Sequence, residues 1–208
     1  MYLIVKNIID RVLALLLLLV LIIIPIIPIT MLLIFIYDYK SVFFIQQRVG
    51  FRSKKFNVIK FRSMTSNADK IIKSQIASGD THVLDFKGAA DQMVTPIGRF
   101  IRKTSIDELP QLINILKGDM AIIGPRPLQE MEVDEFSSLS RVNKELMKQR
   151  LEVKPGLLCY WQITKNKNDM PFEDRMKMDV DYAKNLSFME DLKILVRGIK
   201  TVILGNNM

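Results

Sequence analysis

The sequence predicts a mostly helical α+β fold in two parts, an apolar membrane helix within residues 1–38 and a compact cytosolic domain over residues 39–208. Three observations support this prediction. Val12 to Ile36 carries no charged side chain, which is typical of a membrane-embedded helix. Residues 43–62 contain short apolar-alternating pieces around a glycine, which predicts a small β-hairpin. Apolar residues further along recur at helical spacing, so amphipathic surface helices complete the domain.

Two prolines interrupt the apolar segment. Pro25 and Pro28 each remove a backbone donor and crowd the preceding turn, so we expect a kink there. At ~1.5 Å per residue, the halves on either side measure about 20 Å and 12 Å, and neither alone crosses a hydrocarbon core of ~30 Å. Basic residues flank the segment on both sides, whereas a spanning helix carries them mainly on one side. These observations leave a re-entrant helix and a kinked single span both open.

Positive charge is concentrated directly after the apolar segment. The formal net charge is +8, and the stretch from Lys40 to Arg62 is rich in basic residues and has no acidic one. Next to a membrane helix, such a stretch fits lipid headgroups or a phosphorylated lipid better than nucleic acid, although a solvated positive face is the ordinary alternative. The single cysteine, Cys159, excludes an internal disulfide, and the single histidine, His82, excludes a His-rich metal cluster. Any metal would therefore be a hard cation held by oxygen ligands.

The rest of the chain divides into further helices, turns and short extended segments. In order, we predict a helix and loop at 66–94, a short basic helix at 95–103, a helix at 109–116 closed by a glycine, an apolar run at 120–123 entering the rigid turn "GPRP", one amphipathic helix at 130–151 and a strand-like segment at 157–164. A C-terminal helix at 192–203 carries apolar and basic residues at helical spacing. That pattern suits either a membrane interface or docking on the core.

An adjacent pair of acids, Asp107 and Glu108, precedes the predicted helix at 109–116. Their simplest role is structural, either with Asp107 as the N-cap or with a capping box from Ser105 to Glu108. Neighbouring cations indicate a second role, because arginines keep a carboxylate ionised and receive phosphate groups. An ionised carboxylate is a nucleophile toward phosphorus when cations offset the repulsion between two anions. Capping and catalysis can coexist on one residue.

Together these segments resemble the monotopic phosphoglycosyl transferases, also called bacterial sugar transferases. The similarity covers nearly all of the chain and is carried by "KNIID" before the proline-broken helix, then "FFIQQRVG", "KFRSM", "IGRFIRKTSIDELPQLINILKGDMAIIGPRP", "KPG", "WQ" and "DLKIL". The resemblance implies the minimal catalytic form of the family. It also implies a re-entrant membrane helix, with the catalytic domain lying on the cytoplasmic face of the bacterial inner membrane.

The resemblance further implies a reaction. Such enzymes transfer a sugar-1-phosphate from a UDP-sugar to polyprenol (undecaprenyl) phosphate, release UMP, and so initiate assembly of a lipid-linked glycan or exopolysaccharide. Asp107 would be the nucleophile that carries the phosphosugar, with Mg²⁺ bound beside it, and Glu108 would handle a proton or hold the metal. By motif position, the residues that would hold phosphate or line the site are Lys60, Ser63, Arg102 and Arg126. The implied partners are the two substrates and membrane lipids, without nucleic acid.

The chain also departs from the family pattern. Ile24 stands where a serine usually precedes the kink proline, and Leu158-Cys159 and Lys165-Asn166 stand where Thr-Gly and Gly-Arg are common. Sugar specificity therefore does not follow from the resemblance. Two alternative functions stay open: a membrane-attached glycosyltransferase that releases UDP, and a non-enzymatic membrane-surface scaffold in which the acid pair only caps a helix.

Overall fold

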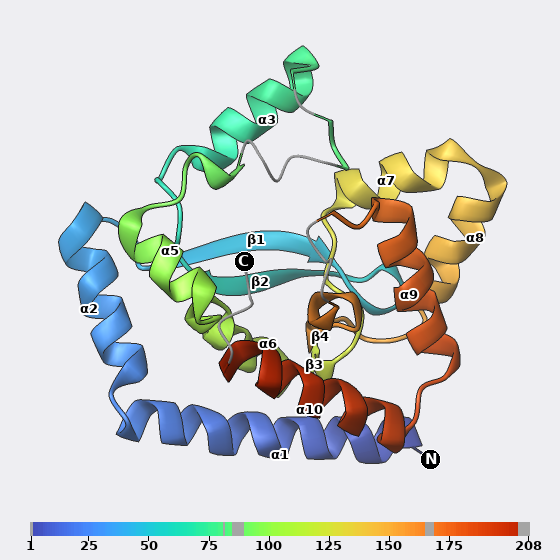
Figure 1. The fold of residues 1–208 in the computed structure, drawn as a ribbon, viewed down its shortest axis with the longest axis horizontal. Helices are drawn as coiled ribbons and strands as arrows, with labels where there is room; N and C mark the ends of the chain where they lie inside the picture. The colour runs from blue at the N-terminus through green and yellow to red at the C-terminus, as the bar shows by residue number, and fades with distance from the viewer. Residues whose placement is uncertain (1, 81, 85–89, 165–168, 204–208) are drawn as a thin grey trace.

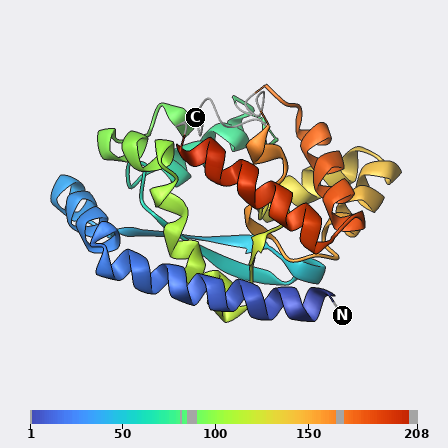
Figure 2. The same ribbon diagram turned by 60° about the horizontal axis from the view of Figure 1, so that its bottom comes forward.

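The computed structural model describes residues 2–80, 82–84, 90–164 and 169–203 (Figures 1 and 2). Its helices are α1 (Tyr2–Ile23), α2 (Ile26–Asp38), α3 (Ala68–Ser78), α5 (Pro96–Lys103), α6 (Leu112–Lys117), α7 (Glu130–Leu139), α8 (Arg141–Arg150), α9 (Phe172–Lys184) and α10 (Phe188–Ile203). Its strands are β1 (Phe43–Val49), β2 (Lys55–Phe61), β3 (Ala121–Ile123) and β4 (Gly156–Leu158). Short 3₁₀ helices are η1 (Phe51–Ser53), η2 (Ile106–Gln111) and η3 (Trp161–Ile163). The predicted mostly helical α+β class is confirmed.

The two small sheets organise the centre of the molecule. β1 and β2 form the predicted antiparallel hairpin, with Phe43 opposite Phe61 and their rings stacked at 5.5 Å. β3 and β4 pair in parallel. Helix α1 passes beneath the hairpin in Figure 1, and its buried Ala14 and Leu21 belong to one core cluster with side chains of β2 and α6. The apolar N-terminal helix is thus part of the fold's core on one side.

The N-terminal helix is broken at Pro25, as predicted, whereas the kink predicted at Pro28 is not present. Helices α1 and α2 meet at an angle of 64°, and the break falls at Ile24 and Pro25. Pro28 lies in the first turn of α2, where a missing backbone donor costs nothing. Among the described residues, no single helix has the length and apolarity to cross a bilayer. Within the part of the chain that the structure describes, the bent α1–α2 pair, taken together, meets that test of length and composition.

A buried polar cluster fastens the start of α1 to the C-terminal part of the chain. Lys6 Nζ lies 2.6 Å from Asp191 Oδ2 of α10 and 3.3 Å from Asp10. The hydroxyl of Tyr182, on α9, donates to the other oxygen of Asp191 at 2.7 Å. Charged groups are costly to bury unless they are paired, and this pairing fixes α1 alongside α10.

Two predicted helices were wrong in detail. The predicted helix 130–151 is two helices, because Ser140 is fully extended and its hydroxyl accepts a bond from Asn143 N at 3.0 Å, which caps α8. The acid pair does not start an α-helix: it lies inside η2, which follows Ser105 in the left-handed region at φ 57°. Of the strand-like segment 157–164, only the start is extended, in β4, and η3 follows. Lys165-Asn166 lies outside the described residues.

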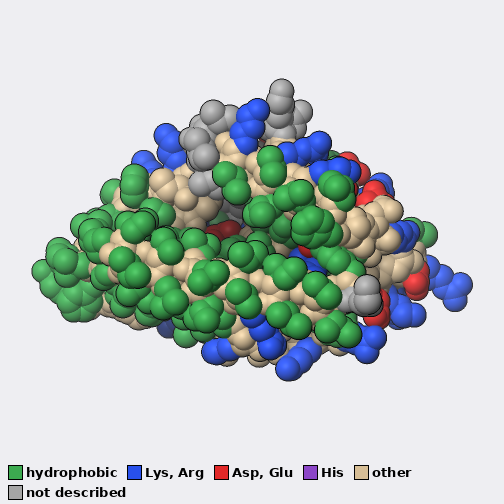
Figure 3. Space-filling view, turned by 90° about the horizontal axis from the view of Figure 1, so that it is seen from below, with side chains coloured by type: hydrophobic (Ala, Val, Ile, Leu, Met, Phe, Trp, Pro, Cys, Tyr) green, Lys and Arg blue, Asp and Glu red, His purple; other side chains and the backbone are tan. Residues whose placement is uncertain are grey.

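One face of the molecule is apolar. Figure 3 views this face, and exposed hydrophobic side chains cover it, with basic groups along its margin. The exposed hydrophobic side chains come from α1, α2 and α10. Ile23, the last residue of α1, is 79% exposed. The opposite side of α10 is packed, since Ile194 is fully buried. We call this face the apolar underside; it includes Leu16, Ile23, Leu32, Phe35, Leu192 and Val196.

Candidate active site

The acid pair lies on a tight backbone segment rather than at a helix end. Ser105 turns the chain into η2, and Glu108 N donates to the Ser105 carbonyl at 3.2 Å. No side-chain capping bond is made at the start of η2 or of α6. Asp107 is nevertheless only 9% exposed. Capping alone therefore does not account for the pair, because these carboxylates are held inside the molecule.

Glu108 is held by a cation from the hairpin. Lys60 Nζ, on β2, lies 2.7 Å from Glu108 Oε1, and both side chains are about four-fifths buried. Burial would raise the pKa of Glu108, but the positive charges of Lys60 and Arg126 hold that pKa below its ordinary value. Glu108 is therefore ionised at neutral pH and already committed to a partner.

Asp107 experiences the opposite balance. Burial, reinforced by the negative charge of Glu108, raises the pKa of Asp107 to about 6, although Lys60, Arg102 and Arg126 act against the rise. Its carboxylate is thus ionised at neutral pH but incompletely compensated. A buried, basic carboxylate of this kind suits attack on an electrophile or binding of a cation.

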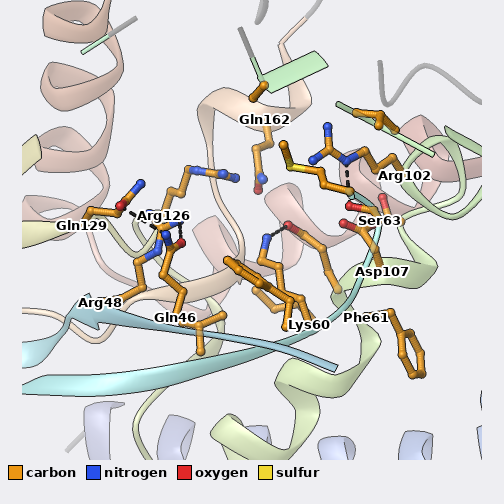
Figure 4. Close-up of a pocket in the computed structure, with 18 of the residues that line it drawn as sticks. Gln46, Arg48, Lys60, Phe61, Ser63, Arg102, Asp107, Arg126, Gln129 and Gln162 are labelled. Atoms are coloured by element: carbon orange, nitrogen blue, oxygen red, sulfur yellow. Dashed lines mark hydrogen bonds and ion pairs between the residues drawn. The ribbon is translucent and has the colours of Figure 1, made fainter. Parts of the chain in front are cut away.

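Ser63 and Arg102 form one side of the site, next to Asp107 (Figure 4). Arg102 Nε, on α5, donates to Ser63 Oγ at 2.9 Å, and Ser63 is the second residue after the end of β2. Helix α5 approaches this closely because it carries Gly98. A Cβ at Gly98 would lie 1.8 Å from the Ser63 carbonyl oxygen, so any side chain there would push α5 away. The glycine of "IGRF" therefore sets the position of Arg102.

Arg126 occupies the rigid "GPRP" turn that follows β3. Its guanidinium carbon lies 6.0 Å from the centre of the buried Trp161 ring, which is within range of a cation–π contact. The ring of Trp161 also receives the guanidinium of Arg175 at 5.0 Å. The "WQ" segment thus orients the arginine of the "GPRP" turn.

All six predicted site residues, Lys60, Ser63, Arg102, Asp107, Glu108 and Arg126, line one cavity of about 1030 Å³. The sequence separates them by up to 66 positions, and the hairpin, α5, η2 and the "GPRP" turn bring them together. Apolar side chains of α1 and α10 form another wall, including Leu17, Leu195 and Ile199. Figure 3 shows acidic atoms in a hollow between the hydrophobic side chains of the underside. The cavity therefore joins a charged floor to the apolar face.

Sequence reasoning missed a second polar cluster in this cavity, on the side away from Asp107 (Figure 4). Gln46 donates to Gln129 Oε1 at 3.2 Å, and Arg48 Nη1 lies 3.2 Å from Glu132 Oε2. Burial lowers the pKa of Arg48 to about 10, against the charge of Glu132. A signal was available, since Gln46 and Arg48 occupy the inward positions of β1, whereas Gln47 between them and Ile45 before them are exposed. Inward polar residues on a strand indicate a site.

The oxygen donors fit a magnesium ion that is completed by substrate. No cluster of three or more His, Cys, Asp or Glu side chains occurs among the described residues. Mg²⁺ usually takes one or two carboxylates and completes its shell with water and substrate phosphates. Asp107 fits as that carboxylate, because Glu108 is already paired with Lys60 and because the burial of Asp107 is incompletely compensated.

Comparison with known proteins agrees with this geometry. The model of the family described as "bacterial sugar transferase" matches residues 1–205. The chain belongs to this family. Similar bacterial sugar transferases include the galactosyl transferase CpsE of Streptococcus agalactiae, 41% identical over 78% of this chain and 34% of the relative. The undecaprenyl-phosphate galactose phosphotransferase of Salmonella typhimurium is 40% identical over 76% of this chain and 32% of the relative.

A shorter relative matches over more of its length. The exopolysaccharide production protein ExoY of Sinorhizobium fredii is 36% identical over 79% of this chain and 71% of its own sequence. The chain thus spans about a third of the first two bacterial sugar transferases and about 70% of ExoY.

Proposed function

We propose that the protein is a phosphoglycosyl transferase that moves a sugar-1-phosphate from a UDP-sugar to undecaprenyl phosphate. The observation that carries this proposal is the buried Asp107 carboxylate, in a cavity shared with Lys60, Arg102 and Arg126 and walled on one side by apolar helices. A UDP-sugar brings a diphosphate, and a polyprenol phosphate brings an anionic head on an apolar tail. The relative from Salmonella typhimurium is named for a galactose phosphotransfer to undecaprenyl phosphate.

The reaction proceeds in two displacements at one phosphorus atom. An oxygen of Asp107 attacks the phosphorus that bears the sugar, the bond to the bridging oxygen breaks, and UMP leaves with that oxygen. An oxygen of the lipid phosphate then attacks the same phosphorus and releases the Asp107 carboxylate, which yields a polyprenyl diphosphosugar. Glu108, held by Lys60, handles the proton of the incoming lipid phosphate by accepting a hydrogen bond from it. Arg102 and Arg126 bind phosphate oxygens.

Asp107 would hold a magnesium ion. When bound, Mg²⁺ would supply positive charge that reduces the repulsion between the anionic nucleophile and the anionic substrate. The arginines are already in place around the cavity, so the protein contributes charge that needs no rearrangement during the reaction.

The protein works at the cytoplasmic face of the bacterial cell membrane, with the apolar underside in one leaflet. The bent α1–α2 pair enters and leaves on the same side, as a re-entrant helix. Exposed apolar patches larger than a few hundred Å² are rare on soluble monomers, and the flanking Arg11 and Lys40 favour one side. In this orientation the cavity opens toward the lipid substrate.

The experiment is incubation of purified protein with undecaprenyl phosphate, Mg²⁺ and a panel of UDP-sugars, with identification of the nucleotide product. UMP release, with a phosphosugar adduct on Asp107 found by peptide mass spectrometry, is expected. UDP release would indicate a glycosyltransferase that moves the sugar alone. Absence of either nucleotide across the panel would favour the membrane-surface scaffold.

A further inference from the structure

The "GPRP" turn is fixed through its carbonyl groups. Two of its residues are prolines, which have no backbone N–H to donate. The Pro125 carbonyl accepts from Gly156 N at 2.9 Å, and the Pro127 carbonyl accepts from Arg48 Nη1 at 3.1 Å. Between them, the Arg126 carbonyl accepts from the guanidinium of Arg150. Three consecutive carbonyls are therefore held from β4, β1 and α8.

The donor to Arg126 is unusual in its burial. Arg150, the last residue of α8, is 2% exposed, and Asp179 of α9 is 1% exposed. Arg150 Nε donates to Asp179 Oδ2 at 2.9 Å, and Nη2 lies 2.8 Å from the same oxygen while also bonding to the Arg126 carbonyl. One planar guanidinium thus joins two helices to the catalytic turn. Lysine offers no such fork of fixed donors.

We infer that Arg150, held by Asp179, is a positioning residue that sets the place of the Arg126 guanidinium in the cavity that contains the acid pair. The inference rests on the proposed function, in which Arg126 binds phosphate. Buried ion pairs often stabilise a fold no better than apolar residues of similar volume, so stability alone does not explain the Arg150–Asp179 pair. The hydrogen bond from Arg150 to the Arg126 carbonyl of the "GPRP" turn gives the pair a second role.

The test replaces the pair without leaving a lone buried charge. Arg150→Met/Asp179→Leu keeps the volume of the α8–α9 contact, so the protein is expected to fold and melt near the wild-type temperature. Turnover, measured as UMP release, is expected to fall about tenfold to a hundredfold, because the Arg126 carbonyl loses a charge-assisted bond and a small displacement at an active site is costly. In an Arg126→Met background the same replacement should lower turnover less than about twofold, since the group being positioned is gone.

Two further variants separate positioning from packing. Arg150→Lys keeps a cation opposite Asp179 and is expected to fold, yet it should lose turnover because the single nitrogen of lysine does not reproduce the fixed, planar arrangement of donors that holds the Arg126 carbonyl. Lys148→Met replaces an exposed lysine on the same last turn of α8, removes an equal charge and should leave turnover unchanged.

The inference is overturned if wild-type protein is active and the paired replacement or Arg150→Lys is equally active. It is also overturned if the effects of Arg126→Met and the paired replacement multiply in full. Absence of UMP release by the wild-type protein would remove the proposed function and this inference with it.

Discussion

In most soluble proteins apolar side chains are buried and charged ones are exposed, and the apolar underside and the cavity above it show the opposite distribution. On the underside, Ile23 is 79% exposed and Val196 is 59% exposed, whereas in the cavity Asp107 is 9% exposed. Both regions share helices α1 and α10, whose inner side chains line the cavity while their outer side chains form the underside. Charged side chains are thus buried behind the same two helices whose outer apolar side chains are exposed. This pairing suits a substrate with an anionic head and a long apolar tail, and each region can be disturbed separately.

The largest expected effect comes from the cavity. Asp107→Asn keeps the shape of the side chain but removes the nucleophilic charge, so turnover should fall about 10⁴-fold or more. The measurement is UMP release, with circular dichroism and vesicle binding to show that the fold and the underside are intact. Asp134→Asn, exposed on α7, is the matched control and should remain fully active. Retained activity in Asp107→Asn would reject the role of this residue as nucleophile.

The next effect concerns the pairing that allows a carboxylate to be buried. Lys60→Met leaves Glu108 without its 2.7 Å partner, so we expect turnover to fall about a hundredfold and the free energy of unfolding to fall by about 1–3 kcal/mol. The pKa of Glu108 is depressed in the folded protein, so this stabilisation is present above its unfolded pKa and is lost as pH falls through the folded value. The difference in the free energy of unfolding between the wild-type protein and Lys60→Met should therefore become smaller at acidic pH.

The control for this variant lies on the same strand. Lys55 pairs with Glu130 at 2.6 Å, but both side chains are about half exposed. Lys55→Met should change the free energy of unfolding by less than about 0.5 kcal/mol, because exposed ion pairs contribute little. Denaturant unfolding of both variants, from neutral pH down to a pH well below the ordinary pKa of a glutamate, makes the comparison. Equal decreases in the free energy of unfolding of the two variants would show that the buried Lys60–Glu108 pair stabilises the fold no more than the exposed Lys55–Glu130 pair does.

A third prediction concerns the ionisation of Asp107. Its pKa is raised to about 6, so the folded protein binds this proton more tightly than the unfolded chain does. This group therefore destabilises the fold at neutral pH, and the loss is recovered as pH falls through about 6. Carbon-13 NMR of labelled aspartate, in buffer without divalent ions, should show a carboxyl with this midpoint that is missing in Asp107→Asn. Mg²⁺ should lower the midpoint; an unchanged midpoint would contradict the metal-binding prediction.

Sequence patterns predicted the cavity better than they predicted its supports. The motifs indicated all six residues that the structure gathers, since charged side chains beside rigid turns carry their own signal. The hairpin and the break at Pro25 also followed from local chemistry. The backbone at the acid pair did not, because the left-handed Ser105 and the 3₁₀ geometry depend on tertiary packing. The burial of Arg150 and Asp179 could not be predicted for the same reason. Both lie on helices with many other charged residues, and only the packing of those helices shows that these two are buried.

A fourth prediction tests the bend that keeps the underside on one side of the membrane. Cysteines introduced at Ile4 and Lys40, in a Cys159→Ser background, should be labelled from the same side of sealed vesicles. Replacing Pro25 and Pro28 together by leucine should straighten the 64° break and move a measurable share of chains to opposite-side labelling. Pro28→Leu alone should have the smaller effect, because Pro28 lies in a helical first turn. Opposite-side labelling of the chain with both prolines would show a true span.

The smallest effect is expected at the margin of the underside, on α10. Leu192 and Val196 are 40% and 59% exposed, and in the proposed orientation each is buried in lipid. Serine at either position should weaken partitioning into phosphatidylglycerol-containing vesicles by about 1 kcal/mol, or about fivefold. Leu139→Ser and Val142→Ser test surface hydrophobicity as such, because these side chains are 58% and 68% exposed at the α7–α8 junction, away from α1 in Figures 1 and 2. Equal losses from both pairs would mean that lipid contact is not confined to the underside. A loss from the α10 pair alone, with turnover on a short-chain water-soluble acceptor retained, would show that the membrane surface and the charged cavity contribute separately.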